Sequence, residues 1–135
     1  KKPIYKFEKL ADFHAAWKDF MWPDEEQRLI NMKNLLQANG ILFLITCFPV
    51  QEQMVEDNIV RDRLFVLKPQ QELASICQKL NIPLLDLWEA FYEERNDENF
   101  FDYLHFTHKG NIIIAENLAR FIKSRGMLRA ISSGN

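Results

Sequence analysis

The residues with the clearest chemical potential lie in the segment Asp102-Tyr103-Leu104-His105-Phe106-Thr107-His108-Lys109-Gly110. An aspartate stands three residues before a histidine, so one carboxylate can reach one imidazole within a turn. Many hydrolases use such a pair to orient the histidine that removes a proton from a hydroxyl nucleophile. His105 is therefore the candidate general base and Asp102 its orienting partner. A motif as short as D-x-x-H also occurs by chance. The alternative is that Asp102 and His105 are only turn and cap residues.

The first half of the chain predicts a helix followed by a buried strand. Pro23 and the acidic residues after it indicate a helix start, and Gly40 indicates its end. Its apolar face is expected to hold Leu29, Met32, Leu35 and Leu36. Residues 41–48 are apolar without polar alternation, which is typical of a strand covered on both faces, and Pro49 ends it. Residues 50–63 are polar and predict a connection or a lid.

The second half repeats this order. A helix is expected from about residue 69 to 80, a short strand at 82–87, and a helical stretch through Trp88. Residues 93–99 predict a charged loop. Thr107 is placed to cap a final helix that runs to about Arg125. The buried side of that helix is expected to hold Ile112, Ile113, Ile114, Ala115, Leu118, Ala119, Phe121 and Ile122. Residues 1–23 are rich in aromatic side chains and predict loop with a short helix around 8–19, as core cover or a lid.

Alternating strands and helices predict an α/β fold with a parallel sheet and right-handed crossovers. Two strands, however, cannot form a sheet that is buried on both faces, because each needs neighbours at its edges. We therefore expect further strands to come from an upstream segment or a partner chain. In such sheets ligands bind beyond the carboxyl ends of the strands, so Phe48, the loop after Leu87 and the turn at 102–105 should gather there.

Composition narrows the class of protein. A chain of 135 residues with 47% hydrophobic residues fits one globular domain. The net charge is −2 without a Lys/Arg block, which argues against a nucleic-acid partner. The apolar run at 41–50 is interrupted by Thr46 and is too short to span a membrane. Cys47 and Cys77 are too far apart in sequence to suggest a metal site, and as reduced buried thiols they favour the cytoplasm.

The order of elements, with Leu85-Asp86-Leu87 in the second strand and D-x-x-H-x-T-x-x-G before the last helix, resembles the C-terminal half of the SGNH/GDSL hydrolases. The resemblance covers most of residues 24–125. It implies a flavodoxin-like α/β/α sandwich, here incomplete, with residues 1–135 as a single domain or its C-terminal portion. It also implies that Asp102 and His105 are members of a Ser-His-Asp triad. Phe106 stands where many members carry proline.

The other family blocks are absent. The family nucleophile lies in a Gly-Asp-Ser turn, and a glycine and an asparagine from later loops help to build the oxyanion hole. The serines of this chain are Ser75, Ser124, Ser132 and Ser133, and none has that context. Asn31 and Asn34 lie on the predicted helix before the first strand, which is a poor position for oxyanion donors. The nucleophile is therefore expected upstream of this chain, and the isolated chain is expected to be inactive.

The resemblance implies a serine hydrolase, esterase- or lipase-like, that acts on a small acyl ester, an acylated carbohydrate or a lipid without a cofactor or metal. Acyl transfer to another acceptor is not distinguished from hydrolysis. The alternative from another class is a non-catalytic protein-interaction module that retains the fold. Two lesser alternatives are a metal site that adds His108 to the pair and a thiol enzyme built on Cys47. His14 is expected to be a packing or surface residue.

Overall fold

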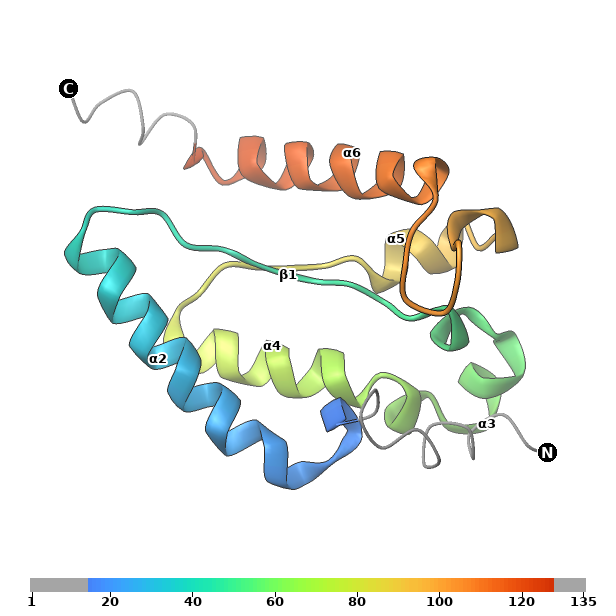
Figure 1. Ribbon diagram of the computed structural model, residues 1–135, viewed down its shortest axis with the longest axis horizontal. Helices are drawn as coiled ribbons and strands as arrows, with labels where there is room; N and C mark the ends of the chain where they lie inside the picture. The colour runs from blue at the N-terminus through green and yellow to red at the C-terminus, as the bar shows by residue number, and fades with distance from the viewer. Residues whose placement is uncertain (1–14, 128–135) are drawn as a thin grey trace.

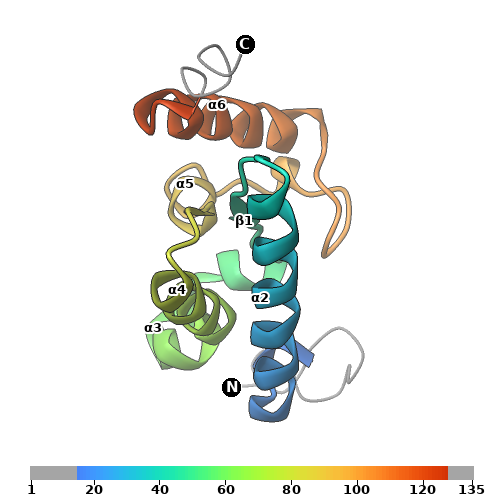
Figure 2. The same cartoon turned by 90° about the vertical axis from the view of Figure 1, so that its left-hand side faces the viewer.

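The computed structural model describes residues 15–127, in which a short parallel sheet lies between two layers of helices (Figures 1 and 2). Helix α6 lies over one face of the sheet, and α2 and α4 lie under the other. The chain is mostly helical and is compatible with part of an α/β fold. In chain order the elements are η1 Ala15–Trp17, η2 Asp19–Met21, α2 Trp22–Ala38, β1 Ile45–Cys47, η3 Gln51–Met54, α3 Glu56–Val66, α4 Lys68–Leu80, β2 Leu84–Asp86, α5 Trp88–Glu93, η4 Asp97–Asn99 and α6 His108–Ser124.

The two strands run parallel, with Ile45 opposite Leu84 and Cys47 opposite Asp86. Because successive side chains of a strand point to opposite faces, each strand contributes to both helical layers. Ile45 and Leu84 pack toward α2 and α4, whereas Leu85 packs toward α5 and α6. The strands thus have helices on both faces, but their side chains are half-buried rather than buried, and Asp86 is exposed.

Each helical layer closes its own core. The core under the sheet is built on Leu29, Ile76, Cys77 and Ile82. The core above it is built on Leu87, Phe91, Phe100 and Ile113. Leu87 and Phe91 are fully buried. This second core ties α5 and α6 to the carboxyl end of β2, which is the end where the candidate site lies.

The outer edge of β1 is unpaired among the described residues, since the sheet there consists of β1 and β2. Ile45 N–H donates to Pro83 O and Cys47 O accepts from Leu87 N–H, so alternate residues point their backbone groups at β2. The N–H and C=O of Thr46 consequently point to the other edge. Figure 1 looks onto this edge, with β1 in front of β2. Exposed apolar side chains lie just before and just after β1 in the chain: Ile41, Leu42 and Phe48.

Several predicted details are wrong. The first strand is three residues long rather than eight, because β2 offers three partners, and Ile41 and Leu42 are exposed. Residues 50–63 are not a polar connection but contain η3 and most of α3. α3 is interrupted by a kink at Asp62, and Ile59 and Val66 are buried on either side of it within an otherwise polar segment.

The apolar faces of two helices were also expected to be more deeply buried than they are. In α2, Leu29 is buried but Met32 and Leu35 are 48% and 65% exposed. In α6, Ile113 is buried but Ile112 is exposed. The part of the predicted helix at 8–19 that is described forms 3-10 turns instead, and the rest lies outside the described residues. The helices α2, α4, α5 and α6 otherwise lie where predicted.

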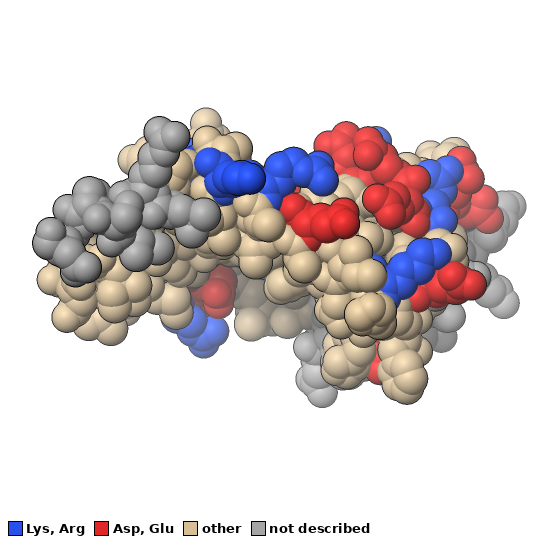
Figure 3. All heavy atoms as spheres, turned by 90° about the horizontal axis from the view of Figure 1, so that it is seen from above, with Lys and Arg blue, Asp and Glu red and all other residues tan. Residues whose placement is uncertain are grey.

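The surface over α6 is charged and mixed in sign. Figure 3 looks onto this side and shows basic and acidic side chains interspersed. Lys109, Glu116, Arg120 and Lys123 are exposed on the helix. Within residues 15–127, no helix combines the length and the hydrophobicity that a bilayer crossing requires.

Replacing Phe91 with alanine should lower the free energy of unfolding by about 3–5 kcal/mol, because the ring is fully buried against two other phenylalanines. Phe20 is 74% exposed, so Phe20→Ala is a matched control and should change it by less than about 0.5 kcal/mol. Urea unfolding followed by circular dichroism measures both. Equal effects of the two substitutions would contradict the assigned core.

Candidate functional site

The structure brings Asp102 and His105 together as the sequence predicts. The His105 Nδ1 atom lies 2.7 Å from Asp102 Oδ2. With the Nδ1 proton directed at the carboxylate, the other ring nitrogen, Nε2, is the one that can accept a proton. This is the arrangement that holds a histidine as a general base.

Asp102 is held by its own turn. Its Oδ1 atom accepts hydrogen bonds from the backbone N–H groups of Leu104 and His105, each at 2.8 Å. These two donors, followed by the imidazole of His105, lower the pKa of the Asp102 carboxyl to about 2. Asp102 is therefore an anion at any pH near neutrality, and an anion is what stabilises an imidazolium beside it.

The loop that carries the pair is pinned on both sides. Within the loop, Phe101 N–H donates to His105 O at 2.7 Å, and Phe100 and Phe106 form an antiparallel bridge. From outside, Gln51 N–H donates to Tyr103 O at 3.0 Å. The segment that follows β1 thus fixes the tip of the loop, and the pair does not depend on a free surface turn.

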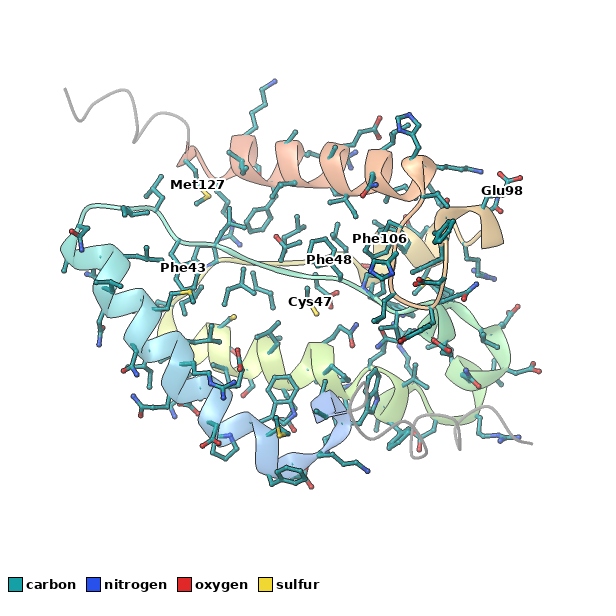
Figure 4. All side chains as sticks on the ribbon, viewed as in Figure 1. Phe43, Cys47, Phe48, Glu98, Phe106 and Met127 are labelled. Atoms are coloured by element: carbon teal, nitrogen blue, oxygen red, sulfur yellow. The ribbon has the colours of Figure 1, made fainter. Side chains whose placement is uncertain are left out.

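Aromatic side chains connect the loop to the carboxyl end of β1. The rings of Phe48 and Phe106 lie 5.8 Å apart, and Phe106 also contacts Phe91 and Phe100 (Figure 4). Phe48 follows β1 directly and is 49% exposed. Phe48 and the loop that contains the 102–105 turn gather at one end of the sheet as predicted, but α5 rather than a loop follows Leu87. Phe48 and Phe106 form a partly exposed aromatic wall at this end.

The pair itself is open. The side chain of His105 is 74% exposed and that of Asp102 is 39% exposed. A cleft of about 540 Å³ borders the loop on its η3 side, with Gln51, Arg95 and Phe100 in its wall, but neither Asp102 nor His105 lines it. General bases work best where water is excluded. The described residues therefore bring the imidazole and the carboxylate together but leave the pair open to water.

The remaining sequence candidates lie away from this pair. Ser75 is exposed on α4, and Ser124 ends α6 with its hydroxyl bonded to Phe121 O. Asn31 and Asn34 are exposed on α2. Ser132, Ser133 and His14 lie outside the described residues. No described serine follows a strand.

A metal site with His108 finds no support in the described part of the chain, which contains no group of three or more potential ligands. His108 is exposed as the first residue of α6. His108 is a suitable control for His105, because it lies three residues further along the chain but is not paired with Asp102.

Cys47 is a poor nucleophile where the structure places it. Burial, the neighbouring Asp86 carboxylate and Cys77 raise the pKa of its thiol to about 12. A reactive cysteine needs the opposite surroundings, because the thiolate is the attacking species. The thiol-enzyme alternative is therefore disfavoured.

Two residues that matter to the loop were not singled out from the sequence. Asn99 is fully buried and donates its amide to Glu94 O at 2.9 Å. Gly110 is buried in the first turn of α6, where its missing side chain leaves room for Asn99 O. The signal for Gly110 was visible, because a glycine inside a helix is unfavourable unless packing demands it. Nothing in the sequence marks Asn99.

The pKa of Asp102 should be about 2 in a carbon-detected NMR titration, well below the ordinary 3.8. His105→Ala should raise it only part of the way, because the two backbone N–H donors remain. Since ionised Asp102 is favoured by the fold, its contribution to stability is present above pH 4 and is lost as the pH falls toward 2. A wild-type pKa near 3.8 would contradict the turn geometry.

Alkylation by iodoacetamide at pH 8 should be slow at Cys47 in the native chain. A pKa of about 12 leaves a thiolate fraction on the order of 10⁻⁴ at that pH. Peptide mapping by mass spectrometry should show labelling at least about a hundredfold faster in guanidinium, where the thiol is unburied. Rapid native labelling of Cys47 would restore the thiol alternative.

The comparisons with known proteins agree with this chemistry at a coarse level. No family model matches the chain. In an alignment 103 positions long that covers 69% of the chain, the chain is 26% identical to the GDSL esterase/lipase WDL1 of Oryza sativa subsp. japonica. The match spans 39% of that protein's length. The chain thus has a distant and partial likeness to a GDSL esterase/lipase.

Proposed function

We propose that this chain is the C-terminal part of an SGNH/GDSL-type serine hydrolase domain that cleaves carboxylic esters. His105 is the general base that activates the nucleophile and then the acid that protonates the leaving alcohol. Asp102 orients His105 and stabilises the imidazolium. The observation that carries the proposal is the 2.7 Å contact between His105 Nδ1 and Asp102 Oδ2 at the carboxyl end of the sheet.

The nucleophile comes from outside these 135 residues. No described serine lies near the pair, and the pair is exposed rather than enclosed. The outer edge of β1 offers the place where an upstream segment, or a partner chain, adds strands and completes the α/β/α sandwich. Its unpaired backbone groups, and the exposed side chains of Ile41, Leu42 and Phe48 before and after it in the chain, are the features that a further strand with its covering helices would bury.

The acyl part of the ester lies against the aromatic wall. Phe48 follows β1 and Phe106 lies in the loop, with their ring centroids 5.8 Å apart, and about half of the surface of Phe48 is exposed. An apolar acyl chain would cover that surface, which stabilises the bound ester in proportion to the area removed from water. An acylated carbohydrate or a lipid offers such a group.

The test is ester turnover by the natural full-length gene product that contains this chain. Hydrolysis of a short-chain nitrophenyl ester should fall by at least about a hundredfold in His105→Ala, because the general base is lost. His108→Ala, three residues further along, is the matched control and should retain the wild-type rate.

Equal activity of the two histidine variants would remove His105 from the mechanism. A full-length protein that folds but turns over no ester would favour the non-catalytic interaction module instead. Comparison of water with added alcohols as acceptors then separates hydrolysis from acyl transfer.

A further inference from the structure

We propose that Thr107 and Gly110 are positioning residues that set the location of His105. They act through the backbone of residues 98 and 99, at the point where the chain enters and leaves the loop. We call residues 98–99 and 107–110 together the neck of the loop. The inference rests on the function proposed above, in which His105 is the general base.

The neck is closed by three hydrogen bonds that converge on one threonine. Thr107 N–H donates to Asn99 O at 3.1 Å, and the Thr107 hydroxyl donates to Glu98 O. The same hydroxyl accepts from Gly110 N–H at 3.3 Å. Thr107 therefore caps α6, and its side chain also joins the segment that leads into the loop to the first turn of the helix.

Gly110 permits this closure. A Cβ atom at position 110 would lie 2.3 Å from Asn99 O and 3.1 Å from the Cβ atom of Phe106. A separation of 2.3 Å is far inside van der Waals contact, so any larger residue must push the two halves of the neck apart. Asn99 cannot retreat easily, because its side chain is fully buried and bonded to Glu94 O.

The loop transmits a change at the neck to the pair. Directly inside the neck, Phe100 and Phe106 form a bridge, and the next pair inward is the hydrogen bond from Phe101 N–H to His105 O. Asp102 follows at once and binds the N–H of His105. Few freely rotating residues separate the neck from the pair, so a displaced Asn99 must shift the backbone on which both side chains stand.

The first test is Gly110→Ala in this chain. Alanine is the better helix former, so without the close approach the substitution would raise the melting temperature. We expect the opposite sign, a lower melting temperature. In the same sample the pKa of Asp102 should move from about 2 toward 3.8, as its backbone N–H donors are displaced. The fraction of neutral His105 that carries its proton on Nδ1, read from the ring nitrogen chemical shifts, should fall.

The second test uses a matched pair at position 107. Thr107→Val keeps the side-chain shape and removes the hydroxyl, and Thr107→Ser keeps the hydroxyl. We expect the valine variant to raise the pKa of Asp102 and the serine variant to restore the wild-type value. This pair decides the matter even where Gly110→Ala does not fold.

The outcomes separate this inference from the proposed function. A wild-type chain with an ordinary Asp102 pKa and no preference of His105 for the Nδ1–H tautomer would overturn the pairing itself, and the function with it. A wild-type chain with both signatures, unchanged in a folded Gly110→Ala or Thr107→Val variant, would overturn the positioning role alone.

Discussion

A parallel pair of strands must be covered on both faces, and this constraint organises the whole chain. The ladder between β1 and β2 is three residues long, yet it separates two cores that otherwise share no helix. The parallel direction of the strands decides where chemistry can occur, because the chain leaves both strands at the same end of the sheet. Phe48 leaves β1 there and Leu87 leaves β2 there, and the second core draws α5 and α6 to the same place. The loop that carries His105 is held between these elements.

The same constraint bears on what the described residues leave open. The sheet they form has two strands, so each strand has one unpaired edge, and that of β1 is bordered along the chain by the exposed side chains of Ile41, Leu42 and Phe48. Among the described residues, Asp102 and His105 are paired on a pinned backbone, but the side chain of His105 is 74% exposed and no serine follows a strand beside the pair. The described residues thus leave both the outer edge of β1 and the Asp102–His105 pair open. The proposal that a further segment completes both follows from this coincidence.

The elements that sequence reasoning located well are those with a strong local signal. Pro23 and Gly40 bracket α2, Thr107 caps α6, and the D-x-x-H spacing leads to the observed contact. The failures share a physical origin. Whether an apolar helix position such as Leu35 is buried depends on neighbours that local patterning does not reveal, and the long apolar run at 41–48 pairs only where β2 offers partners. The close approach of Gly110 to Asn99 depends on packing between segments and could not be predicted in detail.

The central claim is that His105 serves a nucleophile that lies outside this chain. The most direct measurement is the labelling of the natural full-length gene product with a fluorophosphonate, which reacts with an activated serine, followed by peptide mapping. We expect one phosphonylated serine outside these 135 residues, with labelling lost in His105→Ala and retained in His108→Ala. Labelling of a residue within this chain, or labelling that is unaffected by His105→Ala, would contradict it.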